Sequence, residues 1–263
     1  MFLAQSFVDY SWNDIIRWLN IDTLSASDRQ ELYLLLMIAV ITFVLWQFKL
    51  GRKIIMPYYI LGVFFHEIGH AIAILMLGGR PVKVKIYPNG NGVTWSYYQS
   101  FGRFRRTIVS SAGFLGSSIV GGLLIVASRN PQITNNILIF LGVFLLVMTF
   151  IWVREWLGYG FMLMSLWGLI ILAIAYGGHY RVIAFRTPPD VQKLMIQFLG
   201  IQATMINFLN IGYLFDVRRG SDIEKIQRYL LLPYWFWGII VSILCLEIFV
   251  QSIRIAFFTS SFR

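Results

Sequence analysis

Seven long apolar segments divide this sequence, and they constrain its fold more than any other feature. Each approaches the ~20 apolar residues that an α-helix needs to cross the hydrocarbon core of a bilayer. The first segment is short and the sixth carries several polar side chains, so we expect six or seven transmembrane helices. The segments lie near residues 32–48, 54–77, 107–127, 133–153, 156–177, 191–215 and 230–250. This pattern predicts an all-α polytopic membrane protein.

Composition and charge placement favour the same class. Hydrophobic residues make up 58% of the 263 residues and charged residues only 13%, whereas soluble domains carry about 25% charged residues. The formal net charge of +10 comes from basic residues in short segments between the apolar runs. Such segments are typical of cytoplasmic loops rather than of a nucleic-acid surface. We therefore expect the lipid bilayer, and no nucleic acid, among the partners.

The chain is expected to contain one membrane domain and two short flanking regions. Residues 1–30 are interpreted as an acidic leader or a helix in the membrane interface, residues 31–250 as the embedded domain, and residues 251–263 as a C-terminal tail. If all seven segments span, more Lys and Arg lie on the side of the N-terminus, which the positive-inside rule then places in the cytoplasm. This orientation predicts a plasma (inner) membrane protein whose second segment ends on the cytoplasmic side.

An H-E-x-x-H motif lies inside the second apolar segment. His66 and His70 are two of the three histidines in the chain, and a spacing of four places both imidazoles on one helix face, where they can share a metal ion. Zinc suits such ligands and needs a third protein ligand besides an open position. Glu67 without a role at membrane depth would cost about 2.5–3.5 kcal/mol on insertion scales. We predict a zinc site in which Glu67 accepts a proton from water.

A segment with a different pattern follows the motif. Residues 82–87 and 93–97 alternate apolar and polar side chains, and the Pro-Asn-Gly-Asn-Gly run between them favours a turn. The pattern predicts a β-hairpin directly after the motif helix. The hairpin is either a plain extramembrane connector or a sheet edge beside the metal, onto which an extended substrate adds as a strand. In the second case the strands around Val84 and Val93 position the substrate.

The sixth segment carries amide and hydroxyl groups in an apolar background. Polar groups at this depth face a bundle interior or a watery cavity. Hydrogen bonding between helices can explain each of them, and Asn207 is the one that we expect nearest to a substrate. The residues concerned are Gln197, Gln202, Thr204, Asn207 and Asn210.

The motif supplies two metal ligands and leaves the third open. Asp222 has a structural explanation as well, because Ser221 and Glu224 fit a capping box that starts a helix, whose first turn favours an aspartate. A capped helix start is also a rigid place for a ligand, so the two explanations are compatible. Spacing alone does not choose among the candidates in the C-terminal half, which are Glu155, Asp190, Asp216, Asp222, Glu224, Glu247 and His179.

The residues around the motif resemble a compact, PDZ-less branch of the site-2 protease family of intramembrane zinc metalloproteases. The family places its third zinc ligand on an aspartate. The resemblance therefore implies that His66, His70 and Asp222 bind zinc and that Glu67 is the general base. This chain lacks the Leu-Asp-Gly signature of better-known members. The similarity lies in residues 66–71, 78–80, 87–94, 111–116, 207–216 and 220–222.

These inferences predict a zinc metalloendopeptidase that hydrolyses a peptide bond in or near a transmembrane segment of another membrane protein. One alternative is a catalytically silent scaffold of the same fold, which would fail to retain zinc. Another is an ion or solute transporter in which the histidines and acids form an ion path. Transporters often show repeated halves, and no such repeat is visible in this sequence.

Overall fold

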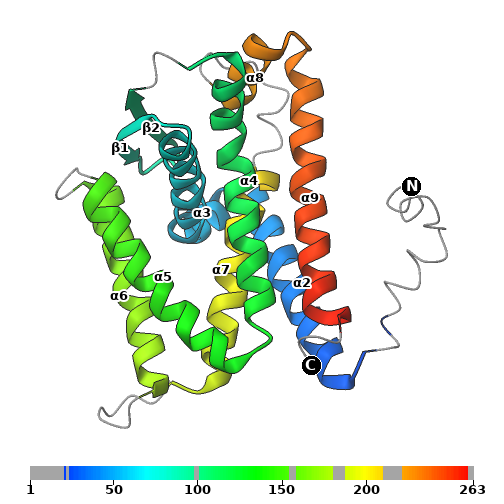
Figure 1. Cartoon of the computed structure of the whole chain (residues 1–263). Coiled ribbons are helices and arrows are strands. Elements are labelled where there is room, and N and C mark those ends of the chain that lie inside the picture. The colour runs from blue at the N-terminus through cyan, green and yellow to red at the C-terminus, as the bar shows by residue number, and fades with distance from the viewer. Residues whose placement is uncertain are drawn as a thin grey trace, which may run out of the picture.

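The computed structural model describes residue 21 and residues 24–97, 101–153, 158–179, 187–209 and 221–259. Within them, six helices are long and apolar enough to cross a membrane: α2, α3, α4, α5, α6 and α9. This confirms the predicted all-α membrane bundle with a β-hairpin after the motif helix (Figure 1). In chain order the elements are α2 (Ala26–Gln47), α3 (Lys49–Met76), β1 (Arg80–Ile86), β2 (Gly92–Tyr97), α4 (Arg103–Ala127), α5 (Pro131–Trp152), α6 (Tyr159–His179), α7 (Pro189–Leu209), α8 (Asp222–Leu230) and α9 (Tyr234–Phe258).

Helix α7, formed by the polar sixth segment, is enclosed by other helices. Every residue from 199 to 207 is buried, so all faces of these turns are covered. The Gln202 amide donates to the Thr42 hydroxyl of α2 at 3.0 Å, and the Gln192 amide donates to Asn135 Oδ1 of α5 at 3.1 Å. These bonds satisfy polar groups that would be costly in lipid. Burial explains how a helix too polar to face lipid occupies the centre of the bundle.

The sixth and seventh apolar segments correspond to α7 and α9. The described part of α7 reaches Leu209, and the expected end of the segment at residue 215 lies outside the described residues. The last apolar segment, expected near residues 230–250, begins and ends later, because α8 extends to Leu230 and α9 begins after Pro233 and continues to Phe258. Proline lacks an amide hydrogen and suits a helix start, so the break falls where the sequence permits one.

Small residues bring α3 and α4 into close contact. A Cβ built on Gly69 of α3 would lie 2.6 Å from the Ala112 carbonyl oxygen of α4. On the other side of α4, a Cβ on Gly200 of α7 would lie 2.8 Å from the Gly121 carbonyl oxygen. Such contacts let helix backbones approach closely in a membrane. They fix the motif helix against α4, which carries part of the site.

The β-hairpin returns along the motif helix. Its antiparallel register pairs Arg80 with Tyr97 at the base and Ile86 with Gly92 near the tip. At the tip Gly90 has φ +83°, and a Cβ there would come within 2.7 Å of the Tyr59 ring of α3. The left-handed backbone and the lack of space both favour glycine. Strand β2 then passes beside the motif.

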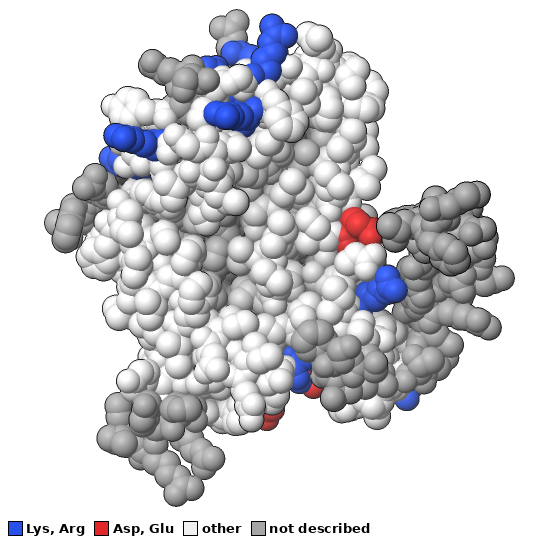
Figure 2. Space-filling model, in the orientation of Figure 1, with Lys and Arg blue, Asp and Glu red and all other residues white. Residues whose placement is uncertain are grey.

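Basic side chains gather at the end of the molecule that holds the hairpin and α8. Figure 2 shows Lys and Arg concentrated there. The described residues concerned lie on β1, at the start of α4 and on α8: Arg80, Lys83, Lys85, Arg103, Arg105, Arg106, Lys225 and Arg228.

Candidate metal centre

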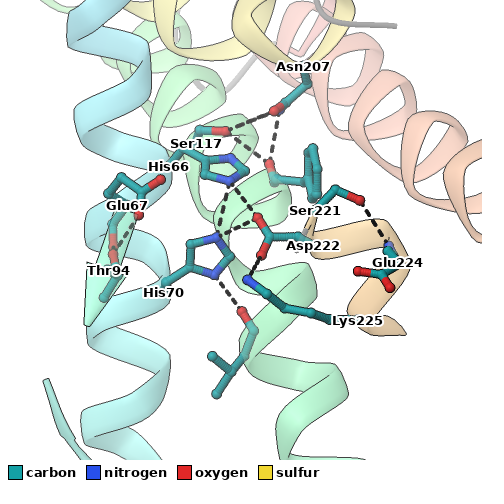
Figure 3. A network of polar contacts seen from close by, with 12 residues as sticks. His66, Glu67, His70, Thr94, Ser117, Asn207, Ser221, Asp222, Glu224 and Lys225 are labelled. Carbon is teal, nitrogen blue, oxygen red and sulfur yellow. Dashed lines mark hydrogen bonds and ion pairs between the residues drawn. The ribbon is translucent and has the colours of Figure 1, made fainter. Parts of the chain in front are cut away.

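Helix α3 directs both motif imidazoles toward α8. His66 and His70 lie one turn apart, and their Nε2 atoms are 3.1 Å from each other. The Asp222 Oδ2 atom lies 3.3 Å from His66 Nε2 and 3.0 Å from His70 Nε2 (Figure 3). Three potential ligand atoms from two helices therefore converge on one point.

The position of Asp222 follows from how α8 begins. Ser221 is the N-cap, and its hydroxyl accepts a hydrogen bond from the Glu224 amide at 3.2 Å. The predicted capped helix start is therefore confirmed, and Asp222 is the first residue of α8. The two carboxylate oxygens have different partners, because Lys225 Nζ donates to Oδ1 at 2.8 Å while Oδ2 faces the imidazoles. The same aspartate serves the helix start and the convergent cluster.

The surroundings of Asp222 favour its carboxylate form. Burial opposes ionisation of this carboxyl. The adjacent His70 imidazole, the hydrogen bonds with both histidines and the Lys225 ammonium outweigh burial and hold the pKa of Asp222 well below its usual value. A charged carboxylate is the form that a metal ion binds.

The His70 ring is held in one orientation by α4. Its Nδ1 atom lies 2.6 Å from the Val109 carbonyl oxygen, to which the ring can donate. This bond holds the ring so that Nε2 points at the cluster, and a metal-binding histidine usually donates its other ring N–H in this way. Gly113 of α4 leaves room beside the rings, because a Cβ there would lie 2.5 Å from Nε2 of both His66 and His70.

Glu67 lies beside the cluster and faces the hairpin. It is 6% exposed, and the Thr94 hydroxyl donates to its Oε2 at 2.6 Å. A cavity of about 240 Å³ opens next to it between β2, α4 and α8. The cavity is lined by Glu67, His70, Ile74, Gly92, Val93, Thr94, Ser96, Val109, Ser110, Ser221, Asp222 and Lys225. The Glu67 carboxylate, which is not one of the three convergent ligand groups, thus borders the cavity beside them.

The donor set fits zinc. Two imidazoles and one carboxylate are a known set for catalytic zinc, with a fourth position left for water or substrate. Ligands about 2.0–2.1 Å from a tetrahedral ion lie roughly 3.3 Å apart. The separations of 3.0, 3.1 and 3.3 Å among the three atoms are close to that spacing.

The other acidic candidates for the third ligand have different positions. Glu224 pairs with Arg228 on α8, and Glu247 accepts from Gln251 at 2.7 Å on α9. Asp190 lies in the first turn of α7. Glu155, Asp216 and the His179 side chain lie outside the described residues. Among the described acids, Asp222 is the one that joins both histidines.

The structure gives the three predicted substrate-positioning residues different surroundings. The Asn207 amide donates to the Phe114 carbonyl at 3.0 Å and to Ser118 Oγ at 2.8 Å, so this residue joins α7 to α4. Val84 is 1% exposed and packs in the main core. Val93 borders the cavity. Of the three, Val93 is the one that lines the cavity beside Glu67.

Three polar contacts of the site were not assigned by sequence reasoning. These are the Thr94 bond to Glu67, the Lys225 bond to Asp222 and the Val109 carbonyl bond to His70. A signal exists for Thr94, because it lies near the start of the predicted strand that follows the motif helix. A backbone carbonyl on another helix leaves no comparable pattern in a sequence.

Comparisons with known proteins identify the family of this chain. No curated protein and no solved structure matches it. One family model, described as peptidase M50B-like, matches residues 34–251. Among the described elements, this range holds the motif, the hairpin, α8 and four of the six apolar helices in full, together with most of α2 and α9. Because the match covers most of the sequence, the chain belongs to the peptidase M50B-like family, a site-2 protease family of membrane metallopeptidases.

Proposed function

We propose that this protein is a zinc-dependent intramembrane protease that hydrolyses a peptide bond in or near a transmembrane segment of another membrane protein. One observation carries the proposal. His66 and His70, on a helix that can cross a membrane, converge with Asp222 beside Glu67 and next to a cavity. Membership of a metallopeptidase family supports it.

Each residue has a distinct role in the proposed reaction. His66, His70 and Asp222 would hold the zinc ion. When bound, zinc supplies a Lewis acid that acidifies water and polarises a carbonyl group. Glu67 accepts the proton of the attacking water and delivers it to the leaving amine. Its location beside the ligand cluster, and outside it, suits a base rather than a ligand.

The exposed edge of β2 suits an extended substrate. Bonded and non-bonded pairs alternate along an antiparallel ladder, and the Tyr87 amide donates to the Asn91 carbonyl at 2.9 Å. By this alternation the Val93 amide belongs to the ladder with Lys85, whereas the amides of Gly92 and Thr94 point away from β1. A peptide unwound from a helix can add as a strand along that edge. Unwinding exposes its scissile carbonyl to the cavity.

The basic end of the molecule supports the proposed orientation. The cavity, the hairpin and α8 lie at the end where Lys and Arg gather (Figure 2). Basic residues are concentrated on the cytoplasmic side of membrane proteins. We therefore place the active site toward the cytoplasm, in a plasma (inner) membrane.

The decisive experiment replaces the base and leaves the ligands in place. Glu67→Gln is expected to abolish cleavage while zinc content stays unchanged, and removal of general-base catalysis lowers rates by about 10²–10⁴-fold. Membrane proteomes of cells that express the wild-type protein or Glu67→Gln should differ by cleavage fragments present only with the wild type. Glu247→Gln is the matched control, because this glutamate lies away from the cluster and pairs with Gln251.

The outcome separates the proposal from its alternatives. Fragments at wild-type levels with Glu67→Gln would contradict the proposed mechanism. Purified wild-type protein without zinc, and without any dependent fragment, would favour a silent scaffold. His66→Ala and His70→Ala should lose zinc as well as cleavage, which elemental analysis of purified protein checks.

A further inference from the structure

Strand β2 holds the carboxylate that the proposed reaction needs as its base. The Thr94 hydroxyl lies 2.6 Å from Glu67 Oε2 and 3.1 Å from the Glu67 carbonyl oxygen. A hydroxyl has one proton to donate, and the shorter contact with the carboxylate is the stronger bond because a charged acceptor strengthens it. Among the described residues, Thr94 supplies the side-chain hydrogen bond to this carboxylate.

The same strand face leaves space for that carboxylate. Alternate residues of a strand share one face, so Gly92 and Thr94 both face Glu67. A Cβ on Gly92 would lie 2.5 Å from Glu67 Cγ and from Oε1. Any larger residue would therefore displace the carboxylate. Gly92 supplies the room and Thr94 supplies the bond.

We propose that Thr94 is a positioning residue that fixes the orientation of Glu67 for proton transfer. This inference rests on the proposed proteolytic function. The bond to Oε2 restrains the side chain and leaves Oε1 for the attacking water. Helix α3 thus carries the base, and strand β2 sets the direction in which its carboxylate points.

The arrangement also connects the base with substrate binding. The edge of β2 that is proposed to receive the substrate strand belongs to the same residues that hold Glu67. A shift of the hairpin would therefore move both the Glu67 carboxylate and the substrate relative to His66 and His70. Catalysis is sensitive to such placement, since a misplacement of about 1 Å can cost on the order of 100-fold in rate.

The kinetic test compares Thr94→Val with Thr94→Ser. Valine keeps the branched shape and removes the donor, so kcat should fall on the order of 10-fold to 100-fold, while KM and zinc content stay near wild type. Serine restores a hydroxyl and should recover most of kcat. The assay uses the transmembrane peptide cut fastest in the proteome comparison, reconstituted in proteoliposomes with each purified protein. A wild-type kcat for Thr94→Val, or no recovery with serine, would overturn the inference.

A second pair of variants tests the space at Gly92. Gly92→Ala should lower kcat with zinc retained, because the added methyl group displaces the Glu67 carboxylate. Gly102→Ala is the matched control, since a Cβ on Gly102 meets nothing within 4 Å. Equal activity of the two variants would contradict a role for this space.

A stability measurement tests the Thr94–Glu67 hydrogen bond without any substrate. Thr94→Val should lower the melting temperature of the wild-type protein more than that of Glu67→Met, because the bond exists only in the former. An equal decrease in melting temperature in the wild-type protein and in Glu67→Met would refute an interaction between Thr94 and Glu67. If the wild-type protein cuts no substrate, the proteolytic function fails, and this cycle still decides whether Thr94 holds Glu67.

Discussion

Two polar clusters lie near opposite ends of helix α4, and they differ in how their charged groups are paired. Near its start the helix borders the candidate metal centre, His66, His70 and Asp222, through the Val109 carbonyl. Just after its end, Arg129 belongs to a charged cluster that also includes Asp28, Glu31 and Lys193. The two sites are separated by 20 residues, or roughly 30 Å along a helix.

The charged cluster neutralises itself. Arg129, whose side chain is 9% exposed, pairs with both Asp28 and Glu31, and Lys193 pairs with Glu31. Two cations meet two carboxylates. Arg129 also lies over the Phe257 ring, 4.7 Å from its centroid. Such a balanced set ties the starts of α2 and α7 to the end of α4 and needs no further ion.

The charges of the candidate metal centre are not paired with one another in this way. The centre combines two imidazoles with one carboxylate oxygen, while Lys225 binds the other oxygen of Asp222 and Glu67 lies nearby. The nitrogen and oxygen lone pairs point at one shared position beside a cavity. The comparison teaches that pairing, rather than burial of charge, distinguishes the two sites: one is complete as a set of ion pairs, and the other is arranged to share a cation.

The largest effect is expected from removing the charge of Asp222. Asp222→Asn should lower zinc affinity by more than the roughly 10–100-fold that loss of an outer-shell partner causes, and should abolish cleavage. Zinc titration of the purified protein measures this. Asp190→Asn, in the first turn of α7, is the control for an aspartate that only favours a helix start. Unchanged zinc affinity in Asp222→Asn would leave Asp222 only a role in the first turn of α8, where an acidic side chain favours the helix start.

An intermediate effect is expected from unbalancing the charged cluster. Arg129→Met leaves two carboxylates without their shared cation and should destabilise the protein by about 3–5 kcal/mol, with zinc affinity of the folded protein unchanged. Thermal unfolding in detergent checks the loss. Arg228→Met is the control, because Arg228 pairs with Glu224 through a side chain that is 62% exposed, and such pairs contribute about 0–1 kcal/mol. Loss of zinc affinity in Arg129→Met would show that the two clusters depend on each other.

The smallest effect concerns the cap that mounts Asp222. Ser221→Ala removes the bond to the Glu224 amide and should cost about 1 kcal/mol of stability, together with a modest loss of zinc affinity. Asn130→Ala removes the corresponding cap of α5, where the side chain accepts from Gln132 and Ile133. That variant should lose similar stability and no zinc affinity. Identical zinc titrations for the two variants would show that the Ser221 cap does not affect how Asp222 binds zinc.

The sequence by itself determined the features that depend on local periodicity. Runs of about 20 apolar residues predicted the membrane helices, a spacing of four placed His66 and His70 on one helix face, and alternation around a Gly-rich turn predicted the hairpin. The cap at Ser221 was equally readable, since a capping residue and its partner lie three residues apart. Each of these patterns is contained within a few turns or strands.

Tertiary structure alone decided which distant groups meet. Asp222 lies 156 residues from His66 in the chain, and local spacing left it equal to Glu224 and Glu247. The packing of α8 against α4 and α9 is what brings it to the histidines. Thr94 acquired its contact with Glu67 only because the hairpin returns along the motif helix. Asn207, for which the sequence left open a hydrogen bond between helices or a place near a substrate, joins α7 to α4. The reason is that periodicity fixes the face on which a side chain lies, whereas the packing of helices and hairpin fixes what that face contacts.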